Sequence, residues 1–481
     1  MTGATHSIRF GTPTARLLMA TAVLASGMAF LDSTVVTVAL PAIEADLGGG
    51  LATLQWVLDS YLLTLGSLVL VGGSLGDLLG LRRVFGWGVV GFLVASVLCG
   101  LAPTAETLIV ARAVQGVAAA LLVPGSLALL SSLFVEDQRG RAIGLWSGLA
   151  GITTAVGPVA GGLLVGLGAS GWRLIFLLNV PLAIAVLVML PKVPSVPGTR
   201  GTGPLLKQVD VLGGVLTAAG LALLIGPLIE LEVLGVARTA VLMTVGVATL
   251  TVFWWLQEGR QRSGEPPPMM PPRLWRIRSF AVANVVTFVV YGALNAGLFL
   301  LTLALQIGLG WSAVAAGMAG LPITLTLVAL SARVGRALPR VGSRVLLTAG
   351  CTLMAVGLAG LATIGVGLVY WTGALPWILV FAGGLVLVVA PITTTALGDI
   401  PVASSGVGSG VNNAVARIAG LVAIAVIPVM AGLSGLESNS GAAVLPGYRR
   451  ATLICAGLCL VGAAISWWGF DRRTGREVVA A

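Results

Sequence analysis

Fourteen long apolar runs make up most of this 481-residue sequence and leave the chain few ways to fold. A helix needs about 20 apolar residues to cross ~30 Å of hydrocarbon, and each run has enough. The runs are continuously apolar, whereas strands of a membrane barrel alternate apolar and polar residues. We predict an all-α polytopic membrane protein with transmembrane helices near 17–40, 51–71, 83–102, 105–133, 141–167, 172–190, 210–229, 238–256, 279–305, 311–331, 343–366, 375–397, 404–432 and 450–470.

Charge and residue usage narrow the class further. Charged residues make up 9% of the chain, against about 25% in soluble domains, which excludes a soluble enzyme. The only histidine is His6 in the N-terminal tail, and the four cysteines lie inside apolar runs, where thiols pack as small apolar groups. We therefore expect no catalytic site, no metal and no cofactor. The sequence also lacks a phosphate-binding loop for ATP.

Lysine and arginine orient the predicted helices. With the N-terminus inside, 21 of the 27 basic residues fall in cytoplasmic segments and four in outer loops, as the positive-inside rule requires. Both termini are then cytoplasmic. This bias accounts for the net charge of +10 without a nucleic-acid partner.

Two short loops with similar sequences indicate an internal repeat. GDLLGLRRV (Gly76 to Val84) follows the second run, and GRALPRVGSRV (Gly335 to Val345) follows the tenth. Six-helix repeats are a transporter architecture, with the substrate bound between the halves. We predict a cytoplasmic tail, a six-helix bundle, linkers with two additional helices, a second six-helix bundle and a second tail, at 1–16, 17–190, 191–278, 279–470 and 471–481.

Four motifs carry a resemblance to a known family. LDSTVVTVALP (Leu31 to Pro41) is similar to a first-helix signature, with Thr37 where Asn is usual. RAVQG (Arg112 to Gly116) resembles a fourth-helix motif, and GPVAGG (Gly157 to Gly162) resembles a fifth-helix motif. GSLGDLLGLRRV resembles a cytoplasmic loop motif, has Leu78 where a basic residue is common, and keeps Gly73, Asp77, Gly80, Arg82 and Arg83.

Together these motifs resemble those of the major facilitator superfamily and, within it, the fourteen-helix drug:proton antiporter branch. The match runs in order along nearly the whole chain. It implies the major facilitator fold, with two six-helix bundles and two inserted helices. It also implies proton-coupled multidrug efflux in a bacterial cytoplasmic membrane, and it leaves the substrate open.

Three ionisable residues inside the predicted helices are candidates for proton coupling. Asp32, Asp59 and Arg112 all lie in the outer half of the bilayer when depth is counted along their helices. A carboxylate there is costly when ionised, so it should face the bundle and alternate between protonated and paired forms. Arg112 cannot lose its proton and needs a partner, for which Asp32 is nearest by depth. A structural role for these residues remains the alternative.

The GPVAGG motif has a mechanical interpretation. Pro158 removes a helical hydrogen bond, while Gly157, Gly161 and Gly162 allow a bend and close helix contact. Such an element can pivot as access alternates between the two sides of the membrane. Glycine–proline kinks are also common in membrane helices without this role.

The loop motif at Gly73 to Val84 suggests a latch. Asp77 can pair with basic residues or with a helix N-terminus, in a contact that breaks when the halves move. The resemblance implies that Gly73, Gly80, Arg82 and Arg83 belong to the same latch. For the two arginines, a topology signal is the alternative.

A second intramembrane arginine, Arg417, lies near the middle of the thirteenth run, beside Asn412 and Asn413. In the superfamily fold this helix faces the second helix, so we expect Arg417 to approach Asp59; snorkelling or carbonyl contacts are the alternative. The side chains expected around the substrate are Trp56, Tyr61, Tyr291, Asn295, Gln306 and Arg417.

The function that the sequence favours is proton-driven export of lipophilic drugs. Two intramembrane acids favour cationic substrates, and the two buried arginines leave neutral or anionic ones open. The alternative is a dedicated exporter of one metabolite or self-made antibiotic. A membrane enzyme is disfavoured because no intramembrane His or Lys can act as a base. We expect a monomer.

Overall fold

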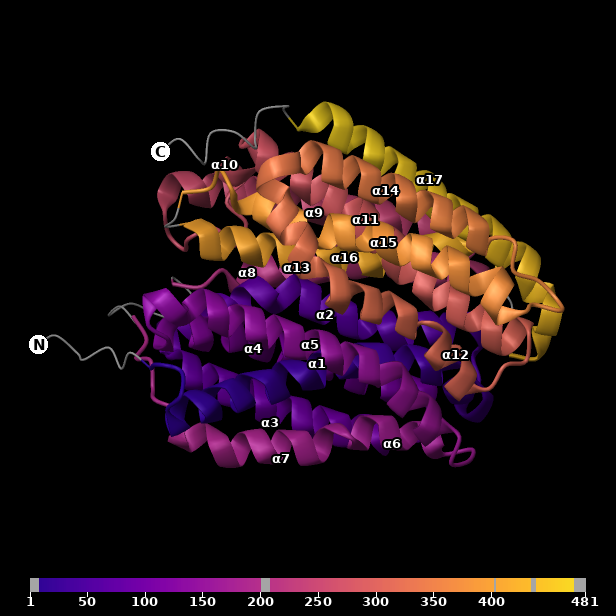
Figure 1. The fold of residues 1–481 in the computed structure, drawn as a ribbon, viewed down its shortest axis with the longest axis horizontal. Helices are drawn as coiled ribbons and strands as arrows, with labels where there is room; N and C mark the ends of the chain where they lie inside the picture. Colours follow the sequence, from indigo (N-terminus) through magenta and orange to yellow (C-terminus); the bar gives the residue numbers. More distant parts are fainter. Residues whose placement is uncertain (1–7, 200–207, 402–403, 434–437, 471–481) are drawn as a thin grey trace, which may run out of the picture.

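The computed structural model describes residues 8–199, 208–401, 404–433 and 438–470. His6 and the predicted C-terminal tail lie outside these ranges, as does the start of the predicted N-terminal tail. Long helices make up most of the described chain and run roughly parallel to one another (Figure 1).

The first seven helices belong to the N-terminal half. They are α1 Pro13–Leu47, α2 Gly50–Leu79, α3 Leu81–Gly100, α4 Ala105–Leu133, α5 Glu136–Val165, α6 Gly171–Leu177 and α7 Asn179–Met189. The C-terminal half contains α11 Arg278–Leu303, α12 Ala313–Ala319, α13 Leu321–Val341, α14 Ser343–Leu361, α15 Leu375–Leu397, α16 Ser405–Met430 and α17 Val444–Gly469. Between the halves lie α8 Val211–Ile229, α9 Leu231–Ser263 and the short α10 Pro272–Trp275.

Thirteen helical stretches within the described residues are long and apolar enough to cross a membrane. Two of them join two α-helices each, since α6 continues into α7 and α12 into α13. The fourteenth predicted run, 141–167, falls on α5, of which Val156–Val165 is the apolar part found among the described residues. The predicted runs therefore match the observed helices.

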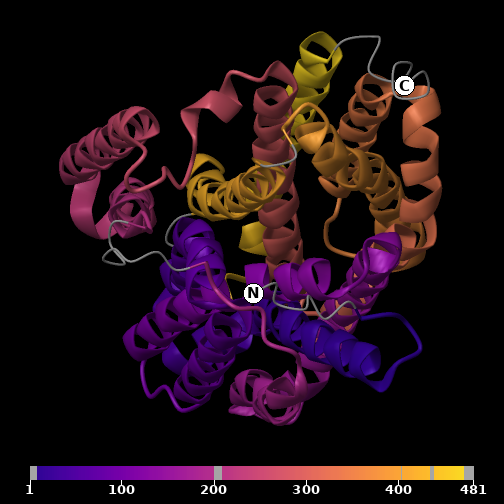
Figure 2. The ribbon, with the colours of Figure 1, turned by 90° about the vertical axis from the view of Figure 1, so that its left-hand side faces the viewer.

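The two halves pack against each other along their length. Viewed along the helices, α1–α7 form one group and α11–α17 another, while α8 and α9 lie at the edge of both (Figure 2). The long contact between halves is that of α2 with α16, and α8 touches both of these helices. We call the end where α1 begins and where α2 meets α3 the arginine-rich end, and the other the opposite end.

The inserted hairpin is attached by a polar cluster at the arginine-rich end. Asp210 is buried and caps α8 by accepting a hydrogen bond from the Gly213 N–H at 2.6 Å. Its carboxylate also accepts from Gln257 Nε2 at 2.6 Å and pairs with Arg260, both on α9. Asp210 therefore joins the start of α8 to the end of α9.

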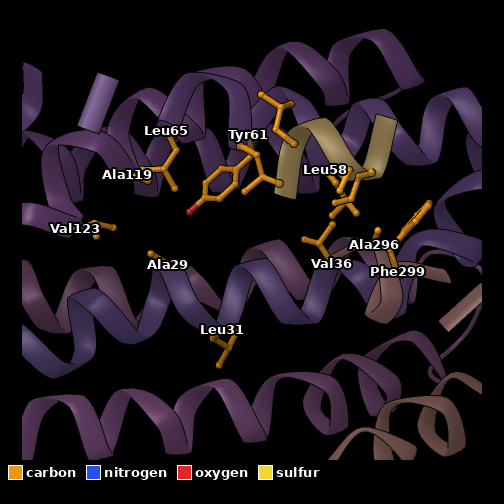
Figure 3. Packing of buried hydrophobic residues seen from close by; sticks show 14 of the residues in the cluster. Ala29, Leu31, Val36, Leu58, Tyr61, Leu65, Ala119, Val123, Ala296 and Phe299 are labelled. Atoms are coloured by element: carbon orange, nitrogen blue, oxygen red, sulfur yellow. The ribbon is translucent and has the colours of Figure 1, made fainter. Parts of the chain in front are cut away.

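Apolar packing fills the interior of the N-terminal half and extends across to the other half. Val36 of α1, Leu58 of α2, and Ala296 and Phe299 of α11 belong to one buried cluster (Figure 3). In the same view the Tyr61 ring points from α2 towards the space between Ala29 and Ala119. This cluster encloses the polar groups described next.

Candidate functional site

The centre of the N-terminal half holds a buried ion pair. Arg112 Nη1 of α4 lies 2.5 Å from Asp32 Oδ2 of α1, and both side chains are 1% exposed. The pairing that their depths predicted is therefore present. Buried pairs are costly to desolvate and persist where further hydrogen bonds satisfy the charged groups.

Three further polar side chains complete this ion-pair network. Asp32 Oδ1 accepts hydrogen bonds from Gln115 Nε2 at 3.0 Å and from Asn179 Nδ2 of α7 at 3.1 Å. Gln115 Nε2 also donates to Ser96 Oγ of α3 at 3.0 Å. Gln115, Asn179 and Ser96 were not among the residues predicted from the sequence. Gln115 stands three residues after Arg112, on the same helix face, and Asn179 is polar within an apolar run, so both carried a usable signal.

Arg112 also reaches the second helix. Its Nε donates to the Val57 carbonyl at 3.0 Å, and its guanidinium lies 4.3 Å from the centre of the Tyr61 ring. Both contacts suit a cation that has no water around it. The network thereby connects α1, α2, α3, α4 and α7. A change of charge at Asp32 would therefore alter contacts of five helices.

Asp59 has a different environment. Its side chain is fully buried, and neither carboxylate oxygen has a hydrogen-bond partner within the described part of the chain. It stands on α2 between Gln55, which donates to the Ile424 carbonyl of α16 at 2.7 Å, and Gly66, which also faces α16. An unpaired carboxyl in an apolar site is expected to be protonated and uncharged.

Arg417 faces α2 as expected, but at a position offset along the helix from Asp59. The helices do face each other, but the Cβ of Arg417 lies opposite Gly66, 3.3 Å from where a Cβ of that glycine would be. Gly66 is seven residues from Asp59, about 10 Å along a helix. The described residues contain no ion pair between them, and Arg417 Nε instead donates to Asn413 Oδ1 at 3.4 Å.

The GPVAGG motif lies where the halves meet, towards the opposite end. Gly157 and Gly161 pack on Thr34 and on the Val35 backbone of α1. Gly162 packs on the Val314 backbone of α12, and the Pro158 carbonyl lies against Gly317. The motif therefore gives α5 a close fit to both halves at once.

A hydrogen bond across the halves adds to this contact. Gln306 Nε2 donates to the Val38 carbonyl of α1 at 3.0 Å, so Gln306 closes the opposite end. Towards the arginine-rich end, a Cβ at Gly140, Gly144 or Gly148 of α5 would meet nothing within 4 Å, and α13 exposes most of its side chains. The halves thus touch at the opposite end, and α5 and α13 are more open at the other.

The turn between α2 and α3 binds the linker that follows α7. Gly80 has φ +97°, a backbone conformation that favours glycine, and it lets α3 start at once. Arg82 Nη1 donates to the Val193 carbonyl at 2.8 Å, and the Thr199 N–H donates to the Asp77 carbonyl at 2.9 Å. Asp77 and Arg83 are exposed and form no ion pair within the described ranges. Gly73 faces Pro124 of α4.

A pocket lies between the halves, and the predicted cavity residues do not line it. Its walls come from α1, α5, α11, α12 and α13 and include Thr34, Thr37, Pro158, Thr302 and Thr324. None of the described residues that line it is charged.

The aromatic and amide candidates lie elsewhere. Trp56 points to the inserted helix α8, where Nε1 donates to Glu230 Oε1 at 2.9 Å. Asn295 Nδ2 donates to the Tyr291 carbonyl at 2.7 Å and packs against Gly420 of α16. Tyr61 of α2 is buried, and Tyr291 of α11, in the other half, is partly exposed.

Known proteins with similar sequences are exporters and resistance proteins. The chain is 36% identical over 436 residues to a probable actinorhodin transporter of Streptomyces coelicolor, covering 88% of this chain and 73% of that protein. It is 35% identical to the methylenomycin A resistance protein of the same organism, covering 95% of this chain and 93% of that protein. The multidrug resistance protein Stp of Mycobacterium tuberculosis is 33% identical, over 83% of this chain and 73% of Stp.

Solved structures with the same fold are distant in sequence. A POT family transporter in complex with a thioalcohol-conjugated peptide superposes with a TM-score of 0.67 at 14% identity, covering 95% of this chain and 96% of that one. The xylose transporter XylE from E. coli superposes with a TM-score of 0.62 at 14% identity, covering 95% of this chain and 98% of that one. The family model of the Major Facilitator Superfamily matches residues 22–424. This chain is thus a multi-pass membrane protein that belongs to the Major Facilitator Superfamily.

Proposed function

We propose that this protein exports lipophilic small molecules in exchange for protons. The observation that carries the proposal is the buried Asp32–Arg112 pair, joined to five helices of one half. A carboxylate that can take up a proton inside the membrane is what coupling requires. The relatives named above are an exporter and resistance proteins, which supports outward transport and antibiotics or drugs as the cargo.

Protonation of Asp32 would act through its partners. A neutral carboxyl no longer attracts Arg112, whose other contacts are to the Val57 carbonyl and Gln115. The balance between α1 and α4 then shifts, and α1 also contacts the GPVAGG motif. Protonation would therefore alter the contact of α5 with α12 that closes the opposite end.

The contacts between the halves suit alternating access. Closure at the opposite end rests on small residues, Gly162 and Gly317, and on the Gln306 hydrogen bond. Contacts of this kind separate at little cost, whereas the long α2–α16 contact can remain as an axis. The positive-inside rule makes the arginine-rich end cytoplasmic. The conformation described above is then inward-facing, with Asp32 deprotonated.

The proton gradient supplies sufficient energy for such a cycle. At a driving force of about 150 mV, one proton contributes about 3.5 kcal/mol, which supports a roughly 300-fold substrate gradient. We place the protein in the bacterial cytoplasmic membrane as a monomer, with small molecules, protons and lipid as its partners. Export of one metabolite or self-made antibiotic is the second candidate, favoured by the names of the actinorhodin and methylenomycin A relatives.

Proton movement in proteoliposomes tests this function. Acid-interior vesicles receive either ethidium, a lipophilic cation, or sulforhodamine B, an organic anion, and the pH gradient is recorded. We expect at least one dye to dissipate the gradient with the wild type and neither with Asp32→Asn. An unaffected Asp32→Asn variant would move the proton site to Asp59. No response to any dye with the wild type would contradict broad export and favour a single dedicated substrate.

A further inference from the structure

The charges between the two halves bear on the substrate class. Our sequence-based expectation was a cationic substrate, because two acids lie within the membrane. That expectation requires at least one of them to present a negative charge to the substrate. The surroundings of each acid in the structure argue against this.

The negative charge of Asp32 is already balanced by a positive charge of the protein. Its carboxylate is 2.5 Å from Arg112 Nη1 and accepts two amide hydrogen bonds, from Gln115 and Asn179. The pair is neutral as a unit and fully buried. A cation in the space between the halves would therefore meet little net attraction from it.

Asp59 gives no negative charge either. It is fully buried on the side of α2 that faces α16, with both oxygens unpartnered among the residues described. An ionised carboxylate without any partner is far too costly in such a site, so this group carries its proton. Neither acid then offers a site for a cation.

Arg417 is the charge that remains. It stands near the middle of α16, opposite Gly66 of α2, and it is partly exposed. Its one hydrogen bond to a side chain in the described ranges is to Asn413 at 3.4 Å, and no acid pairs with it there. A guanidinium cannot be neutralised by losing its proton, so it needs a negative group.

The approach from the arginine-rich end is basic as well. Arg333, Arg336 and Arg340 are exposed on the part of α13 that lies towards that end. The hydrogen bonds of Arg333 and Arg336 go to carbonyls of their own helix, and none of the three pairs with an acid in the described chain. A row of unpaired cations attracts anions and raises their local concentration.

We propose that the exported compound is a lipophilic organic anion whose negative group binds Arg417. This inference rests on the proposed export function and specifies its substrate. Tyr291 of α11 is partly exposed and could offer its ring to an aromatic or conjugated body. Substrate binding would supply the counter-charge that the protein itself does not place beside Arg417.

Substrate charge also sets the response to voltage. Exchange of a monovalent cation for one proton moves no net charge, whereas exchange of a monovalent anion moves two charges in the same sense. Each charge that crosses 100 mV changes the limiting gradient by ~50-fold. Export of an anion should therefore depend steeply on membrane potential.

The test compares two dyes that share a xanthene ring system and differ in charge. Sulforhodamine B is anionic and rhodamine 6G is cationic. Purified full-length protein is used for binding by fluorescence anisotropy, and in proteoliposomes for transport at potentials set with potassium and valinomycin. The variants are Arg417→Gln, Arg417→Lys and, as a matched control, Arg449→Gln at an exposed position of the opposite end.

We expect the wild type to bind sulforhodamine B at least tenfold more tightly than rhodamine 6G. Export of sulforhodamine B should accelerate when the potential on the side that it leaves is made more negative. Arg417→Gln should weaken sulforhodamine B binding at least tenfold without weakening rhodamine 6G. Arg417→Lys should stay within about threefold of the wild type, and Arg449→Gln should match it.

Other outcomes overturn the proposal in distinguishable ways. Preference for rhodamine 6G, with proton exchange that depends on Asp32, leaves the export function standing and rejects the anion. Equal loss of both dyes in Arg417→Gln assigns that arginine to structure alone. Failure of the wild type to bind or move either dye rejects both the anion and broad export.

Discussion

Gly162 offers the most direct perturbation of the contact that closes the opposite end. In Gly162→Ala the new Cβ would lie 2.6 Å from Val314 Cα, 2.8 Å from Val314 N and 2.9 Å from Ala313 O. All three are backbone atoms, which cannot rotate away as a side chain can. Carbon atoms prefer about 3.5–4.0 Å, so α5 and α12 must separate by roughly 1 Å.

This clash raises the free energy only of the conformation in which the opposite end is closed. Overpacking of this kind costs about 1–3 kcal/mol, which is a roughly 5- to 150-fold shift towards the state with the opposite end open. The helix propensity gained by replacing glycine, up to about 1 kcal/mol, is the same in both states and cancels. The variant should therefore fold normally while closing less often.

Cysteine labelling measures the shift. The four native cysteines are buried, and in a background where they are replaced by alanine, Thr302→Cys places a thiol in the cavity between the halves. We expect Gly162→Ala to raise its rate of reaction with a membrane-impermeant maleimide, applied from the opposite end, by about 5- to 150-fold. Gly144→Ala is the matched control, because a Cβ there meets nothing within 4 Å. An unchanged rate, or an equal rise in the control, would refute the reasoning.

Two further predictions concern the inserted hairpin. Trp56→Phe removes the hydrogen bond to Glu230 and should cost about 1 kcal/mol of stability while leaving the KM of any transported dye unchanged; a tenfold rise in KM would return Trp56 to the substrate site. Asp210→Asn leaves Arg260 without its buried partner and should cost roughly 3–5 kcal/mol in unfolding experiments, with normal transport by the folded fraction. Glu258→Gln, which removes exposed ion pairs to Arg262 and Arg276, should cost under about 1 kcal/mol, and a cost equal to that of Asp210→Asn would contradict the burial argument.

The helices were predictable from the sequence because each one must cross the membrane, and length and hydropathy alone identify such segments. The partner of Arg112 was predictable too, since depth along a helix follows from residue count and few acids share that depth. Gln115 and Asn179 were overlooked although both are polar residues in apolar runs, where every polar group needs a partner.

The rotation of each helix about its own axis and its register against the neighbouring helices were not predictable. Apolar residues occur on all faces of α2, so the sequence does not indicate that Trp56 points to α8 while Tyr61 points to Arg112. The offset of Arg417 from Asp59 has a similar cause. Small residues set how closely α2 and α16 approach, and the position of Gly66 opposite Arg417 emerges only when both helices are packed.

The position of α8 has a consequence for compounds dissolved in the lipid. Because α8 touches both α2 and α16, it covers the seam between the halves on that flank, with α9 outside it. Among the described helices, the inserted hairpin packs on α2 and α16 rather than on α5 and α13. A hydrophobic compound that partitions into the inner leaflet would therefore enter sideways through the flank of α5 and α13, so the inserted hairpin would make lateral uptake from the bilayer one-sided.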